Sequence, residues 1–124
     1  MNGLGNLLID TNVIIYALEG REEVKPYMFS SLWVSHITKI ELLGVKNISD
    51  VELARCEYFL NDCTLVDYYS DLTKITVEIK QKYSIKVPDA IIAATSIYLQ
   101  IPLLTSDKGF TKIPELELIL LELN

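Results

Sequence analysis

Acidic side chains stand where short apolar segments of this sequence end. Asp10 directly follows the apolar run Leu7-Leu8-Ile9, and Asp107 closely follows Leu103-Leu104-Thr105. Such short apolar runs are typical of buried strands. Because ligands of parallel sheets bind beyond the carboxyl ends of the strands, both acids lie where such a sheet would carry its binding site.

Two further acids stand near the beginnings of expected helices. Glu41 lies in the first turns of a helix after Leu32-Trp33-Val34, and Asp89 opens a buried helix directly after Pro88. Several carboxylates in a small space repel one another and raise one another's pKa. Mg²⁺ or Mn²⁺ would remove that repulsion, because hard cations prefer oxygen ligands. The pattern therefore indicates a metal site shared by the four acids.

Each acid also has a purely structural explanation, which the sequence leaves open. Asp10 is suited to cap the helix after it, since aspartate accepts hydrogen bonds from exposed helix N–H groups. Glu41 lies three residues after Thr38, which is the spacing of a capping box. Asp89 suits a helix N-terminus through the helix dipole, and Asp107 suits an ordinary turn. Caps and turns are common for single acids, whereas four acids at one predicted edge are less easily explained in this way, so both interpretations stay open at this point.

The elements that must position these acids alternate between strands and helices. Strands are expected at 7–9, 32–34, 64–66, 103–105 and 118–121, and helices at 12–18, 37–43, 50–60, 70–83 and 88–99. This alternation predicts an α/β fold with a mainly parallel sheet covered on both faces. The length of 124 residues predicts one domain spanning 1–124.

Composition limits the remaining classes of protein. Half of the residues are hydrophobic and the formal net charge is −6, so a simple basic-patch nucleic-acid binder is disfavoured. The sequence has no apolar run of about 18 residues that would predict a membrane span, and its first residues lack the positive charge and apolar core of a signal peptide. We therefore expect a cytoplasmic protein in which Cys56 and Cys63 are reduced thiols.

The segments around the four acids resemble the motifs of the PIN-domain ribonucleases, in particular the VapC-like toxins of type II toxin–antitoxin systems. Leu8-Ile9-Asp10-Thr11-Asn12-Val13 is similar to the opening motif of the family, and Ile40-Glu41-Leu42-Leu43-Gly44 to its second motif. The segment 88–95, with sequence PDAIIAAT, is the most specific match, and 104–110 resembles the last motif. The order and separations of these segments fit a compact PIN domain over almost the whole chain.

The resemblance implies a three-layer α/β/α sandwich with a mainly parallel central sheet and Mg²⁺- or Mn²⁺-dependent hydrolysis of RNA. It also implies a homodimer that pairs with an antitoxin protein. The alternative is a non-catalytic PIN-like domain that binds RNA or protein, against which the four intact acids argue. By carry-over, the catalytic and metal-binding residues are Asp10, Glu41, Asp89 and Asp107, and the supporting residues are Thr11, Asn12 and Thr105.

An RNA strand must still approach an acidic chain, so the lysines require interpretation. Lys39, Lys46 and Lys108 lie near the acidic motifs in the sequence and are candidates for phosphate contacts. The lysines within residues 80–86 are explained more simply as a solvated helix face.

Overall fold

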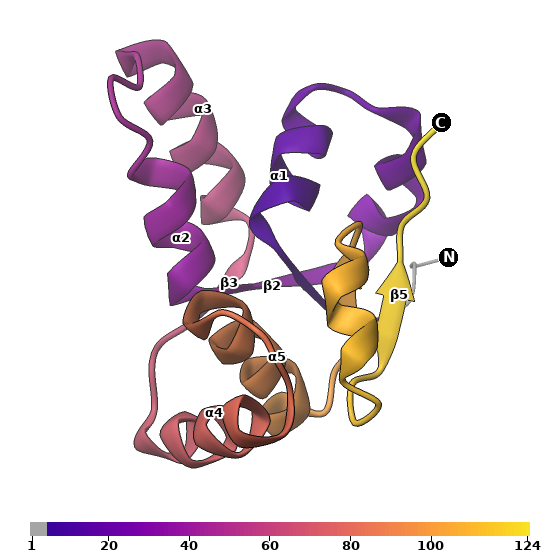
Figure 1. Ribbon diagram of the computed structural model, residues 1–124. Coiled ribbons are helices and arrows are strands. Elements are labelled where there is room, and N and C mark those ends of the chain that lie inside the picture. Colours follow the sequence, from indigo (N-terminus) through magenta and orange to yellow (C-terminus); the bar gives the residue numbers. More distant parts are fainter. Residues whose placement is uncertain (1–4) are drawn as a thin grey trace.

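The computed structural model describes residues 5–124 (Figure 1). Five strands form one all-parallel sheet of order β3-β2-β1-β4-β5. The strands are β1 (Asn6–Ile9), β2 (Ser31–Ser35), β3 (Thr64–Val66), β4 (Leu103–Thr105) and β5 (Leu118–Leu120). The α-helices are α1 (Thr11–Leu18), α2 (His36–Leu43), α3 (Asp50–Asn61), α4 (Ser70–Lys82) and α5 (Val87–Leu99), with 3₁₀ helices η1 (Glu22–Phe29) and η2 (Lys108–Lys112).

The central strand β1 separates two hydrophobic cores. Leu7, Leu8 and Ile9 are fully buried, and successive side chains of a strand point to opposite faces of the sheet. Leu8 packs in the core that contains Ala93 of α5, whereas Leu7 and Ile9 pack in the core that contains Val13 of α1. Helices therefore cover both faces, and the predicted three-layer α/β/α fold is confirmed.

Local capping groups determine where several helices begin. The side chain of Asp10 accepts a hydrogen bond from the Val13 N–H at the start of α1, and Ser35 and Ser49 cap α2 and α3 in the same way. The expected capping box at Thr38 is wrong, because Thr38 lies fully buried inside α2. Each expected strand and helix otherwise agrees with the observed one to within one residue at either end.

The two 3₁₀ helices were not expected from the sequence. In η1, Pro26 lies inside the element and Val24 is its one buried residue, so no apolar periodicity marks the segment. Within residues 5–124, no helix has the length and apolar character that crossing a membrane requires.

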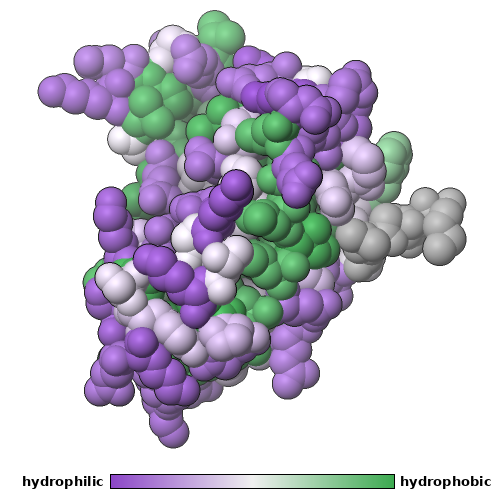
Figure 2. Space-filling view, turned by 45° about the vertical axis from the view of Figure 1, so that its right-hand side comes forward, coloured by the Kyte–Doolittle hydropathy of each residue, from purple (hydrophilic) through white to green (hydrophobic). Residues whose placement is uncertain are grey.

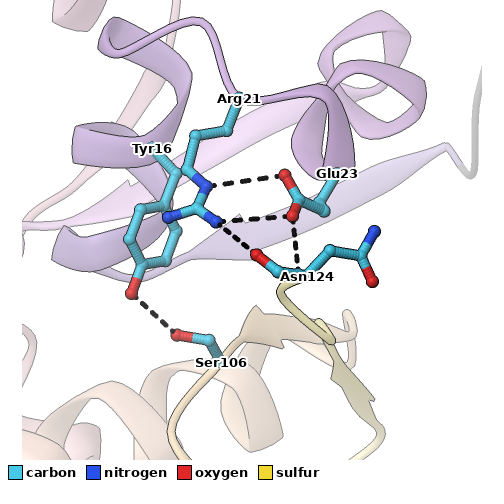
Figure 3. A network of polar contacts seen from close by, with 5 residues as sticks. All are labelled: Tyr16, Arg21, Glu23, Ser106 and Asn124. Carbon is cyan, nitrogen blue, oxygen red and sulfur yellow. Dashed lines mark hydrogen bonds and ion pairs between the residues drawn. The ribbon is translucent and has the colours of Figure 1, made fainter.

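The last described residue is held against the segment that follows α1 (Figure 3). The backbone N–H of Asn124 donates to Glu23 Oε2 at 2.8 Å, and Arg21 Nη2 donates to the Asn124 carbonyl at 3.3 Å. Arg21 also forms an ion pair with Glu23 at 3.4 Å. These contacts join the segment after β5 to η1.

We expect this attachment to depend on the charge of Glu23. The backbone N–H of Asn124, the N–H of Glu23 itself and the Arg21 side chain lower the pKa of Glu23 from 4.5 to about 2. A lowered pKa means that the carboxylate stabilises the fold above pH 4.5 and that this contribution is lost as the pH falls toward 2. Thermal melts of Glu23→Gln should therefore give a Tm below that of the wild type at about pH 6 and nearly equal to it near pH 2.

The matched control is Glu22→Gln, because the contact that Glu22 makes among residues 5–124 is an exposed ion pair with Lys25. Its Tm should follow that of the wild type across the whole range. A Tm difference for Glu23→Gln that stayed constant with pH would contradict the assignment.

Candidate functional site

The four acids singled out in the sequence line one cavity of about 200 Å³. Asp10 directly follows β1, Glu41 lies on α2, Asp89 lies in the first turn of α5, and Asp107 follows β4. Because β1 and β4 are parallel neighbours, their carboxyl ends bring Asp10 and Asp107 to the same edge of the sheet. The predicted juxtaposition of the four acids is therefore observed. The remaining lining residues of the cavity are Thr11, Asn12 and Ile92.

Asp10 is the most buried of these acids, with 6% of its surface exposed. Its Oδ1 accepts from the Val13 N–H at 3.2 Å, and its Oδ2 accepts from the hydroxyl of Thr105. Burial raises the pKa of Asp10, as do the charges of Asp107 and Asp89, while the two hydrogen bonds oppose this rise. Asp10 is thus both the cap of α1 and a carboxylate held rigidly toward the cavity.

Thr105 and Thr11 each connect two parts of the site. Thr105 is fully buried, and its Oγ1 accepts from the Asp107 N–H at 3.0 Å while its hydroxyl donates to Asp10. The Thr11 hydroxyl donates to Glu41 Oε1 at 2.7 Å, which joins the start of α1 to α2. The supporting residues named from the sequence thus contact the acids, except that Asn12 is seen only to line the cavity.

Asp89 and Asp107 form the more open side of the cavity. Asp89 is half-buried, and burial raises its pKa, as do the nearby charges of Asp107 and Glu41. Asp107 is exposed and caps η2, since its Oδ1 accepts from the Gly109 N–H at 2.8 Å. The structural interpretation of Asp107 as a turn residue is therefore correct. The other carboxylate oxygen of Asp107, Oδ2, accepts no hydrogen bond from residues 5–124.

The donor set fits a hard divalent cation that retains much of its water. Within the described residues, no group of three acidic, histidine or cysteine side chains is arranged to hold an ion unaided. Mg²⁺ is usually bound through one or two carboxylates and keeps several waters, so such a closed protein cage is not required. Oxygen ligands around a cavity of about 200 Å³ provide both the charge and the room for a hydrated ion.

A polar network supports the segment that carries Thr105 and Asp107 (Figure 3). Ser106 lies between them, and its hydroxyl donates to the Tyr16 hydroxyl at 3.4 Å. The guanidinium of Arg21 lies 5.3 Å from the centre of the Tyr16 ring, which is the geometry of a cation–π contact. Sequence reasoning missed this connection, because Tyr16 and Ser106 are 90 residues apart and belong to no common motif.

The profile of the PIN domain family matches residues 7–116. The chain therefore belongs to the PIN domain family. It is 30% identical over 126 residues to the Ribonuclease VapC of Rickettsia bellii (strain RML369-C), a match that covers 91% of this chain and 94% of that relative.

Solved structures agree with this assignment. A chain of a toxin–antitoxin complex from Klebsiella pneumoniae is 30% identical, covers 91% of this chain and 95% of its own, and has a TM-score of 0.78. A chain in the crystal structure of VapBC2 from Rickettsia felis bound to a DNA fragment has a TM-score of 0.82 at 21% identity. The match covers 94% of this chain and 99% of that chain. At that identity the second match shows the shared fold alone.

We expect Asp89→Asn to leave the stability of the metal-free protein unchanged or slightly higher. A negative charge in the first turn of a helix is stabilised by about 0.3–1 kcal/mol through the helix dipole. The raised pKa of Asp89 indicates that burial and the charges of Asp107 and Glu41 outweigh such gains. The substitution should therefore not lower the Tm in EDTA, and any increase should shrink in high salt, which screens the repulsion.

Asp50→Asn provides the matched control, because Asp50 occupies the first turn of α3 and lies outside the acidic cavity. Its Tm should fall slightly. A decrease for Asp89→Asn as large as that for Asp50→Asn would argue against repulsion within the cavity.

Proposed function

We propose that this VapC-like PIN-domain protein is a divalent-metal-dependent endoribonuclease and the toxin component of a toxin–antitoxin pair. The observation that carries the proposal is the convergence of four acids from four separate elements on one cavity. The 30% identity to a protein named Ribonuclease VapC supports RNA as the substrate. The reaction would be hydrolysis of an RNA phosphodiester bond with Mg²⁺ or Mn²⁺.

The residues of the cavity would have different roles in the reaction, depending on how firmly each side chain is held. Bound Mg²⁺ or Mn²⁺ would supply a water of lowered pKa and neutralise charge on the phosphate. Asp10 is buried and bonded to Val13 and Thr105, so it would be the least mobile ligand. Glu41 or Asp89 would accept the proton of the attacking water, since both line the same cavity.

An antitoxin partner and a homodimer are further parts of the proposal. The solved relatives include a toxin–antitoxin complex from Klebsiella pneumoniae, and an acidic cavity would attract a basic segment of such a partner. Figure 2 shows hydrophobic side chains reaching the surface of the face that it draws. Large apolar side chains such as Phe29, Val51 and Tyr58 are each more than two-thirds exposed, as suits a protein with interfaces.

The first test is RNA cleavage by the purified chain with Mg²⁺ or Mn²⁺. We expect cleavage that EDTA abolishes and that falls on the order of 100-fold or more in Asp89→Asn and in Glu41→Gln, because each removes charge from the cavity. Asp50→Asn should cleave like the wild type. Binding of RNA with no metal-dependent cleavage by the wild type would instead support the non-catalytic alternative.

Thr105→Val should weaken metal-dependent activity while preserving the fold. The substitution keeps the shape of the side chain but removes the hydroxyl that orients Asp10 and accepts from the Asp107 N–H. Losing such an outer-shell partner typically costs 10- to 100-fold in metal affinity or activity. The measurement is the Mg²⁺ concentration needed for half-maximal cleavage.

Two controls accompany this variant. Thr105→Ser retains the hydroxyl and should recover most of the activity. Thr95→Val removes another buried threonine hydroxyl, which donates to the Ile91 carbonyl within α5, and should leave the Mg²⁺ requirement unchanged. An unaltered Mg²⁺ requirement in Thr105→Val would show that this hydroxyl does not support the site.

A further inference from the structure

A second groove, of about 620 Å³, adjoins the acidic cavity. The two hollows share Asp89 and Asp107 in their walls, so they lie side by side at these two acids. The other charged residues of the groove are all basic, namely Lys80 from α4, Lys86 from the residue before α5, and Lys112 from the end of η2. In a chain with a net charge of −6, three lysines around one groove are a marked local concentration of positive charge.

Two of these lysines also shape the groove. Lys80 Nζ donates to the Ile85 carbonyl at 2.7 Å, and Lys112 Nζ donates to the Ser84 carbonyl at 2.8 Å. Both bonds hold the loop between α4 and α5 in place. Because an ammonium group has three donors, each lysine retains two for a ligand in the groove.

Lys86 is the lysine most directly related to the acids. Its positive charge lowers the pKa of Asp89, in opposition to burial and to the charges of Asp107 and Glu41. Within residues 5–124 its ammonium group makes no hydrogen bond, so it does not brace the loop as Lys80 and Lys112 do. Lys86 is therefore free to contact a ligand that reaches from the groove toward the acids.

The sequence pointed to other lysines for this role. Lys39, Lys46 and Lys108 are exposed, and none of them lines the groove. Lys82 forms an ion pair with Glu115 at 3.4 Å and is also absent from its walls. The solvated-face interpretation therefore suits Lys82, whereas the folded chain turns Lys80 and Lys86 toward the site.

We propose that this lysine groove binds the phosphodiester backbone of the RNA strand next to the phosphate that is cleaved. The inference rests on the proposed nuclease function, since it places the cleaved phosphate in the acidic cavity. The neighbouring phosphates of the same strand then lie along Lys86, Lys80 and Lys112. Lysine–phosphate attraction is independent of base sequence, so the groove supplies affinity and direction to the strand and leaves base selection to other residues.

The test is binding of a labelled single-stranded oligouridine to the full chain in EDTA, where cleavage is prevented. Lys86→Gln should bind several-fold more weakly at low salt, and the slope of log affinity against log salt should fall by about 0.7 for the lost phosphate contact. Lys86→Arg should restore the slope, because it keeps the charge. Lys25→Gln is the control, since Lys25 pairs with Glu22 on η1 away from the groove, and it should bind like the wild type.

The outcomes separate this proposal from the nuclease proposal. An unchanged affinity and salt slope in Lys86→Gln, or no RNA binding by the wild type in EDTA, would overturn the lysine groove. A wild type that fails to cleave RNA, together with weaker binding by Lys86→Gln, would support binding of the RNA backbone in the groove but refute the nuclease and the placement of a cleaved phosphate beside the groove. Metal-dependent cleavage together with the expected loss of binding in Lys86→Gln would support both.

Discussion

The burial of the Asp10 carboxylate at the end of the central strand is the constraint on which the rest of the site depends. An ionised carboxylate loses much of its hydration when buried, and neighbouring acids add to the cost. The Val13 N–H and the Thr105 hydroxyl offset part of that cost. Both donors require the fold, since Val13 belongs to the helix that Asp10 caps and Thr105 ends the adjacent strand β4.

Structural and functional interpretations of single acids therefore need not exclude each other. Asp10 caps α1 and Asp107 caps η2, and both line the cavity. A cap positions a carboxylate well, because one oxygen is held by backbone N–H groups while the other is directed elsewhere. Only the capping box proposed for Glu41 failed, because Ser35 starts α2 and leaves Thr38 inside the helix.

The features predicted best from the sequence are those that depend on residues close together in the chain. Apolar runs such as 7–9 and the cap at Ser49 defined strands and helices to within one residue. The predicted strand ends and helix starts together placed all four acids at one edge. Contacts between distant segments could not be read in this way. Lys112 donates to the carbonyl of Ser84, which lies 28 residues away in the sequence. The segment of η1 has no periodic apolar pattern from which it could be predicted.

An acidic protein that binds a polyanion needs one group of residues to attract the polyanion and another to carry out the reaction. A uniformly negative surface would repel RNA. A uniformly basic surface would bind RNA but would not attract a divalent cation. Here the acids and the lysines are adjacent but distinct, with Asp89 and Asp107 at their common boundary and Lys86 beside Asp89. In the proposed function, the lysines would attract the RNA strand whether or not a cation is bound, and the acids would remain available for the cation. The short loop between α4 and α5, braced by Lys80 and Lys112, is what keeps these two charge environments side by side.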